Sequence, residues 1–117
     1  YKAAYEYNTP AIATSASAHK GSLLAETSLF SLTSDSAYIA QIKKAEDDDD
    51  IIVRIVEAEG KDTQAELKVN PIFKINSASE TNLLELEPKP IKFSNQSVAL
   101  PIGHFEIKTI KLSLSAK

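Results

Sequence analysis

Residues 43–60 read KKAEDDDDIIVRIVEAEG and join an acidic run to the longest apolar run of the chain. The four consecutive aspartates, 47–50, cannot share a core, because each buried carboxylate would need its own partner. The run 51–58 that follows is mostly β-branched, which favours a packed strand over a helix. We therefore predict a central strand over 51–59, covered on both faces, with the aspartates at the tip of the hairpin that enters it.

Arg54 lies inside this otherwise apolar strand, so its guanidinium needs a partner if it is buried. We expect Arg54 to pair with a carboxylate of this domain, or to face a neighbouring part of a larger protein.

The length of 117 residues is typical of one domain, so we expect a single unit over 1–117. The net charge of −3 and the scattered lysines argue against nucleic acid as a partner. The absence of cysteine excludes disulfides and thiolate metal sites and fits a reducing compartment, so we expect a cytoplasmic protein. No apolar run reaches the ~20 residues that span a bilayer, so we expect no membrane partner.

The chain contains no methionine and opens on Tyr1. It also lacks the basic start and apolar middle of a signal peptide. We expect a piece of a longer polypeptide, and the chemistry of that polypeptide then lies in another part of it.

Short apolar segments with turn residues between them recur about every ten residues, which predicts an all-β fold, an antiparallel β-sandwich. The predicted strands are 1–7, 28–32, 38–44, 51–59, 63–69, 72–75, 91–93, 97–100 and 105–114. Residues 63–69 alternate strictly between apolar and polar, so one face of that strand is buried. Residues 77–81 read as a polar crossing segment. The apolar positions of 105–114 change parity after Ile107, which predicts a β-bulge near residues 108–109.

Neither a metal site nor a catalytic site is predicted, and we assign no catalytic, cofactor-binding or metal-ligating residue. The aspartates 47–50 are consecutive, whereas calcium needs spaced ligands with turn residues between them, so a solvated tip is the better interpretation. His19 and His104 stand in no metal-ligand spacing. Carboxylates are plentiful, but nothing in the sequence brings two of them together across a cleft.

The aromatic residues suggest one binding surface. Most of them fall within apolar strand patterns and fit the core. Tyr1, Tyr5 and Tyr7 would share one face of a strand over 1–7. Tyr5 and Tyr7, together with Arg54, are therefore our candidates for contacts to a sugar or to another domain, and a carbohydrate-binding module remains an alternative function.

Five segments also occur in the order of a known family. They are AYEYNTP at 4–10, SLFSL at 28–32, IKKAED at 42–47 leading into IVRIVEAEG at 52–60, ETNLLE at 80–85, and HFEIKTIKL at 104–112. This order resembles the C-terminal β domain of glycoside hydrolase family 38 α-mannosidases. The family often has a glycine in the acidic turn, where this chain has only aspartates.

The resemblance implies a non-catalytic C-terminal domain of an enzyme that removes α-linked mannose with retention. It also implies that the aspartate nucleophile and a divalent metal, usually zinc, belong to an N-terminal catalytic domain, and that this fragment itself carries no cofactor. The expected partners are the remainder of the parent chain and, through it, mannose-containing glycans.

Overall fold

The structure, a computed structural model, describes residues 1–117 as one short helix and eight strands. The elements are α1 (Lys2–Asn8), β1 (Phe30–Thr33), β2 (Ala37–Lys44), β3 (Ile51–Glu57), β4 (Thr63–Val69), β5 (Phe73–Thr81), β6 (Lys89–Pro90), β7 (Ser97–Ile102) and β8 (Ile107–Ala116). No helix is long and apolar enough to span a bilayer.

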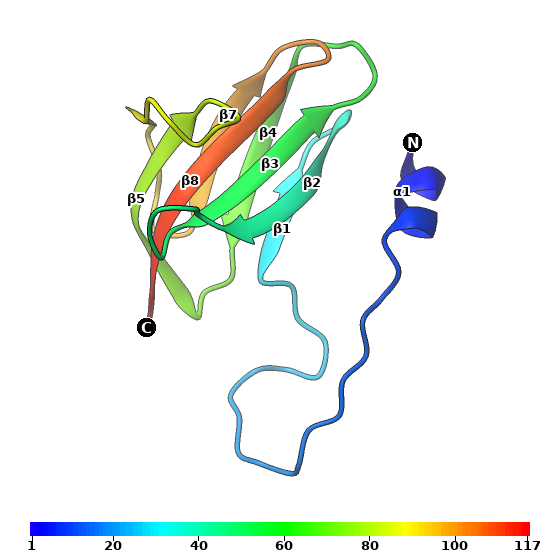
Figure 1. The fold of residues 1–117 in the computed structure, drawn as a ribbon, viewed down its shortest axis with the longest axis vertical. Helices are drawn as coiled ribbons and strands as arrows, with labels where there is room; N and C mark the ends of the chain where they lie inside the picture. The colour runs from blue at the N-terminus through cyan, green and yellow to red at the C-terminus, as the bar shows by residue number, and fades with distance from the viewer.

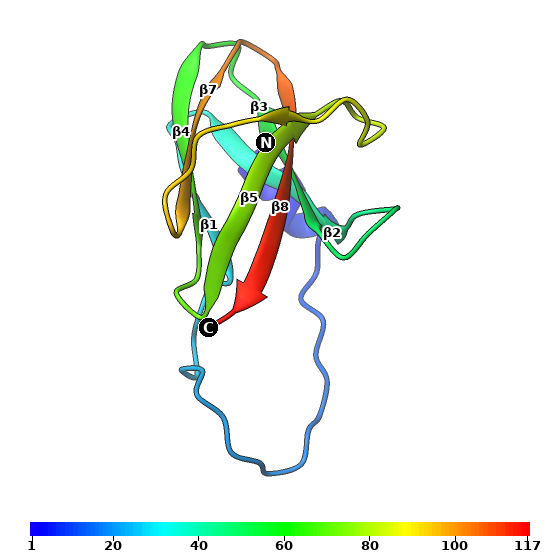
Figure 2. The ribbon, with the colours of Figure 1, turned by 90° about the vertical axis from the view of Figure 1, so that its left-hand side faces the viewer.

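The strands form two sheets that pack face to face, as Figures 1 and 2 show. One sheet has three strands in the order β1-β4-β7, and the other has five in the order β2-β3-β8-β5-β6. Every strand pair is antiparallel. The predicted antiparallel β-sandwich is therefore confirmed.

The core lies between the two sheets and contains 13 buried hydrophobic residues. β4 contributes Ala65, Leu67 and Val69, the three apolar positions of its alternating pattern. β3 contributes Val53 and Ile55 from the facing sheet. Burial of such side chains stabilises the fold by roughly 1.5–3 kcal/mol each relative to an exposed state.

β2 and β3 form the predicted hairpin, in which Lys44 pairs with Ile51 and the aspartates occupy the connecting tip. β3 ends at Glu57 rather than at residue 59, and it lies between β2 and β8. It is an interior strand, although β8 holds the middle of the five. Val53 is fully buried on the core face and Ile52 on the opposite face, so both faces of β3 are covered as predicted.

The predicted strand over 1–7 is wrong, because these residues form α1. The Tyr5 N–H donates to the Tyr1 carbonyl at 2.9 Å, one helical turn away. Lys, Ala and Glu are favourable helix residues, and tyrosines at positions 1 and 5 fit the helical spacing as well as a period of two. Residues 9–29 contain neither helix nor strand and loop away from the sandwich before they enter β1 (Figure 1).

The prediction that residues 77–81 form a crossing segment between strands is also wrong, because β5 continues through them and ends at Thr81. The predicted strand over 91–93 is absent, and the short β6 lies just before it at Lys89–Pro90. Pairing with β8 from Phe73 to Thr81 explains the extended β5, since the neighbouring strand supplies hydrogen bonds that the polar residues 77–81 alone do not predict.

The predicted bulge near Lys108 and Thr109 is wrong as well. The register between β3 and β8 runs unbroken from the Ile51–Leu112 pair to the Val56–Ile107 pair. Ile107, at the start of β8, lies half-exposed on the outer face of the sheet. Lys108, the next residue, is buried on the opposite face. The sheet instead carries a bulge on β5, between Ile75 and Ser77.

Candidate functional site

Arg54 lies on the outer face of β3 and is bound on two sides. Its Nη1 donates to Oε1 of Gln41 at 2.7 Å, and its Nη2 donates to the Leu83 carbonyl at 3.0 Å. The same Nη2 lies 3.7 Å from Oε1 of Glu85, so the predicted pairing with a carboxylate of this domain is confirmed. Arg54 therefore holds the loop 82–87, between β5 and β6, against the sheet.

Glu85 is the acidic centre of this network, and sequence reasoning missed it. Only 6% of its side chain is exposed, and it accepts from Lys43 Nζ at 2.8 Å and from the Glu46 N–H at 2.9 Å. The hydrogen bond from Lys43 and then that from Glu46 lower the pKa of Glu85, against the opposing effect of burial. Glu85 thus anchors the 82–87 loop to the β2–β3 hairpin as an ionised carboxylate.

Glu57 is buried at the end of β3 and accepts three backbone hydrogen bonds. The donors are the N–H groups of Glu59 at 2.9 Å, Gly60 at 2.8 Å and Phe105 at 2.8 Å. Burial raises the pKa of Glu57, but the three N–H groups, together with the Ser36 hydroxyl, outweigh it and lower the pKa to about 2. A carboxyl group that is ionised this firmly is suited to holding two loops together and not to donating a proton near neutral pH.

Lys108 and two glutamates form a second cluster of charged side chains, at the same end of the sandwich as Glu57. Its Nζ lies 2.8 Å from Glu80 and 3.1 Å from Glu106, and Glu106 also accepts from the Gly103 N–H at 2.6 Å. Burial lowers the pKa of Lys108, whereas its bonds to Glu80 and Glu106 raise it, and the net shift is upward. Both carboxylates are engaged by the ammonium that lies between them.

The aspartates at the hairpin tip form ion pairs with different lysines. Asp48 lies 2.5 Å from Lys111, and Asp49 lies 2.7 Å from Lys44. Nowhere in the structure do three His, Asp or Glu side chains gather in a way that could hold a metal ion.

Tyr1 and Tyr5 of α1 pack against Tyr38 of β2. The ring centroids of Tyr1 and Tyr38 are 5.1 Å apart in a stacked arrangement, and those of Tyr5 and Tyr38 are 5.3 Å apart in an edge arrangement. The Tyr5 hydroxyl donates to the Ala40 carbonyl at 3.5 Å. Tyr7 is 86% exposed, so the predicted common face of Tyr1, Tyr5 and Tyr7 is wrong, since a helix sets Tyr7 apart from the other two.

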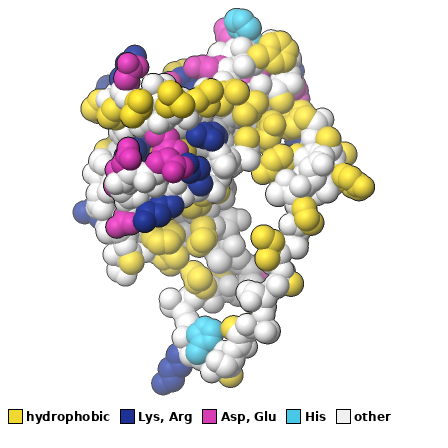
Figure 3. Space-filling view, in the orientation of Figure 1, with side chains coloured by type: hydrophobic (Ala, Val, Ile, Leu, Met, Phe, Trp, Pro, Cys, Tyr) yellow, Lys and Arg dark blue, Asp and Glu magenta, His cyan; other side chains and the backbone are white.

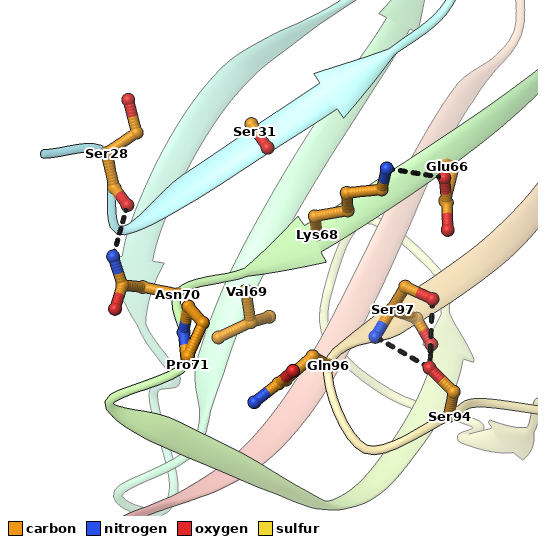
Figure 4. Close-up of a pocket in the computed structure, with 10 residues that line it drawn as sticks. All are labelled: Ser28, Ser31, Glu66, Lys68, Val69, Asn70, Pro71, Ser94, Gln96 and Ser97. Carbon is orange, nitrogen blue, oxygen red and sulfur yellow. Dashed lines mark hydrogen bonds and ion pairs between the residues drawn. The ribbon is translucent and has the colours of Figure 1, made fainter.

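A polar groove of about 450 Å³ lies at one end of the three-stranded sheet (Figure 4). Its lining combines serine hydroxyls, side-chain amides and one ion pair, and consists of Ser28, Ser31, Glu66, Lys68, Val69, Asn70, Pro71, Ser94, Gln96 and Ser97. Lys68 and Glu66 lie 3.1 Å apart. These residues come from three separate segments of the chain, 28–31, 66–71 and 94–97, so no local sequence motif predicts the groove.

A family model described as "Glycosyl hydrolases family 38 C-terminal beta sandwich domain" matches residues 36–110, more than half of the chain. The chain belongs to this family. Comparison with curated protein sequences gave no significant match.

The family 38 domain as matched begins just before β2 and ends within β8. The match therefore includes Arg54, Glu57 and Glu85, the residues that fix the loops of the five-stranded sheet. α1 lies outside it, and so do Tyr5 and Tyr7. β1, which is part of the three-stranded sheet, also lies outside the match.

Proposed function

We propose that residues 1–117 serve as the non-catalytic C-terminal domain of an α-mannosidase, whose catalytic part removes α-linked mannose with retention. The family match over residues 36–110 carries this proposal. The parent polypeptide is a glycosidase in this view, and the domain described here stabilises it and helps to frame its active-site cleft.

The charged residues support a structural role. A retaining glycosidase needs two carboxyl groups about 5–5.5 Å apart that face one sugar. In this chain the buried carboxylate of Glu57 is held by backbone N–H groups, and that of Glu85 by Lys43 and a backbone N–H. Both carboxylates serve the fold.

The divalent metal that the family resemblance implies, zinc above all, belongs to the catalytic part of the parent. The residues of this chain do not fit it, because no three His, Asp or Glu side chains gather at one place. In this proposal the domain meets mannose-containing glycans only through the catalytic part of the enzyme.

The direct test is hydrolysis of an aryl α-mannoside by the chain alone and by the intact parent enzyme. We expect turnover by the parent and none by the chain. Turnover by the chain alone, in a preparation free of other mannosidases, would overturn the proposal.

The polar groove supports a second candidate, a carbohydrate-binding module. Hydroxyl and amide groups in a groove of about 450 Å³ offer donors and acceptors to a polyhydroxylated ligand (Figure 4). Titration with mannosides and mannan tests it. Saturable binding that Gln96→Ala abolishes would support the groove, and binding that Tyr5→Ala abolishes would support the tyrosine cluster. If neither mannosides nor mannan bind, the structural role is the one candidate function that remains.

A further inference from the structure

A long segment joins α1 to the sandwich without hydrogen-bonding to it. Residues 9–26 contain neither helix nor strand, and their one hydrogen bond is local, between His19 and Ser17. Figure 3 shows open space between this segment and the sandwich. The first residue after it that is bound is Thr27, whose hydroxyl accepts from Nδ2 of Asn70 at 3.1 Å. We call residues 9–26 the tether, because they connect α1 to the point where the chain joins the sandwich.

α1 is held against the sandwich by aromatic contacts to β2. Tyr1 and Tyr5 pack on the ring of Tyr38, and the Tyr5 hydroxyl donates a long hydrogen bond to the Ala40 carbonyl. No residue of α1 is buried. Helices shorter than ~12–15 residues are marginal in water on their own, so α1 depends on these contacts for its conformation.

The packing of α1 on the sandwich is incomplete. A cavity of about 370 Å³ lies between them, as item-by-item lining shows: residues of α1 form one wall, and Phe30, Leu32 and Ile39 of β1 and β2 lie on the other. Stable interfaces are packed as densely as protein interiors, which contain few voids larger than a water molecule. The contact between α1 and the sandwich lacks this density and is therefore weak.

We propose that α1 is a strap that stays on the sandwich only because the tether keeps it nearby, and that one cut in the tether releases it. A tether of this length has an r.m.s. span of roughly 25 Å and keeps α1 at an effective concentration on the order of mM. A separate peptide would need a much larger contact, since interfaces between separate proteins bury about 800 Å² on each partner. The inference concerns contacts within residues 1–117 and does not depend on the proposed function.

Lys20 is the position at which a protease specific for basic residues can make this cut. It is exposed, lies within the tether, and is the one Lys or Arg between Lys2 and Lys43. Exposed segments of this kind are the preferred sites of proteolysis. Release of α1 uncovers the ring of Tyr38 and the carbonyl of Ala40 at the edge of the five-stranded sheet.

Limited trypsin digestion tests the inference, and it is stopped when mass spectrometry shows a single cut, after Lys20. At micromolar concentration the docked fraction of α1 should fall at least ~10-fold, because the freed peptide 1–20 is about a thousandfold more dilute than a tethered helix. Gel filtration should then separate the peptide from the sandwich. Lys20→Gln, which removes the cut site, is the matched control and should keep α1 docked under the same treatment.

NMR signals of the tyrosine rings report docking in the same samples. We expect the cut to move the signals of Tyr38 to the positions that they have in Tyr5→Ala, a variant that releases α1 without a cut. Tyr7→Ala, at an 86% exposed position of the same helix, is the control and should leave the Tyr38 signals unchanged.

Three results would overturn the inference. Peptide 1–20 could co-elute with the sandwich after the cut while the Tyr38 signals stay the same, which would mean that α1 holds without the tether. The Tyr38 signals of the intact chain could already equal those of Tyr5→Ala, which would mean that α1 is not docked. Sedimentation could show a dimer of the intact chain that Tyr5→Ala abolishes, which would mean that α1 docks on a second copy.

Discussion

At the scale of single residues, Glu57 shows how one carboxylate can organise two loops. It accepts from Glu59 and Gly60, directly after β3, and from Phe105, in the turn before β8. The stretch that ends β3 is thereby fastened to a segment 48 residues later in the chain. The sequence predicts the strand, but a glutamate at its end gives no sign of which N–H groups it will meet.

This arrangement predicts an acid-dependent stability. The pKa of Glu57 is about 2 in the folded chain, below its ordinary value of 4.5. A depressed pKa means that the stabilisation is fully present above about pH 4.5 and is lost as the pH falls toward 2. We expect Glu57→Gln to lower the melting temperature at pH 7 and to flatten its dependence on pH in this window. Parallel pH profiles of the two proteins, measured by circular dichroism, would contradict the role of Glu57.

At the scale of elements, β4 is the strand whose sequence pattern and structure agree best. Its alternation places Ala65, Leu67 and Val69 in the core and leaves Gln64 and Lys68 exposed. The middle position, Leu67, is fully buried, and it pairs with strands on both sides.

Leu67→Ala is therefore expected to destabilise the chain by about 2–5 kcal/mol, the usual cost of removing a buried leucine side chain. The free energy of unfolding in urea measures the effect. Lys68→Ala, the neighbouring exposed position, is the control and is expected to stay within about 0.5 kcal/mol. Similar losses for both variants would mean that β4 does not face the core as described.

The elements that sequence reasoning missed depend on contacts with distant parts of the chain. Residues 77–81 are polar, and only pairing with β8 makes them a strand. Ile107 and Ile110 look like one apolar set interrupted by a bulge, but they belong to opposite faces of a regular strand. The strand predicted over residues 1–7 is wrong because tyrosines at positions 1, 5 and 7 satisfy the strand period as well as part of a helical one.

Some features of the candidate site also follow from the local sequence, and others depend on contacts between distant residues. The need of Arg54 for a carboxylate follows from its position in an apolar strand. The identity of that carboxylate, Glu85, follows only from the path of the 82–87 loop, which the sequence does not give. The polar groove joins residues as far apart as Ser28 and Ser97, so no local pattern could reveal it.

At the scale of the whole molecule, the chain consists of a sandwich with an N-terminal segment attached to its side. α1 contains no buried residue and touches the sandwich mainly through Tyr1 and Tyr5. The family match also begins after this segment, at residue 36. The sandwich should therefore remain folded without it.

We expect removal of residues 1–26 to preserve the circular dichroism spectrum of the strands. The deletion keeps Thr27 and Ser28, which hydrogen-bond to Asn70. The two lost aromatic pairs are worth about 0.5–1.5 kcal/mol each, so the free energy of unfolding should fall by roughly 1–3 kcal/mol. Loss of the folded spectrum would show that the segment is required for the sandwich.

The four outer strands of the two sheets have a consequence for behaviour at high concentration. An open strand edge invites another chain to add to it, and proteins blunt such edges with short strands, prolines and irregularities. Here β1 has four residues, β6 has two and ends in Pro90, and β7 contains Pro101. β2 breaks its register at Ala40, whose carbonyl is already taken by the Tyr5 hydroxyl. Every edge is thus protected, so this sandwich is built to resist fibre formation through strand addition.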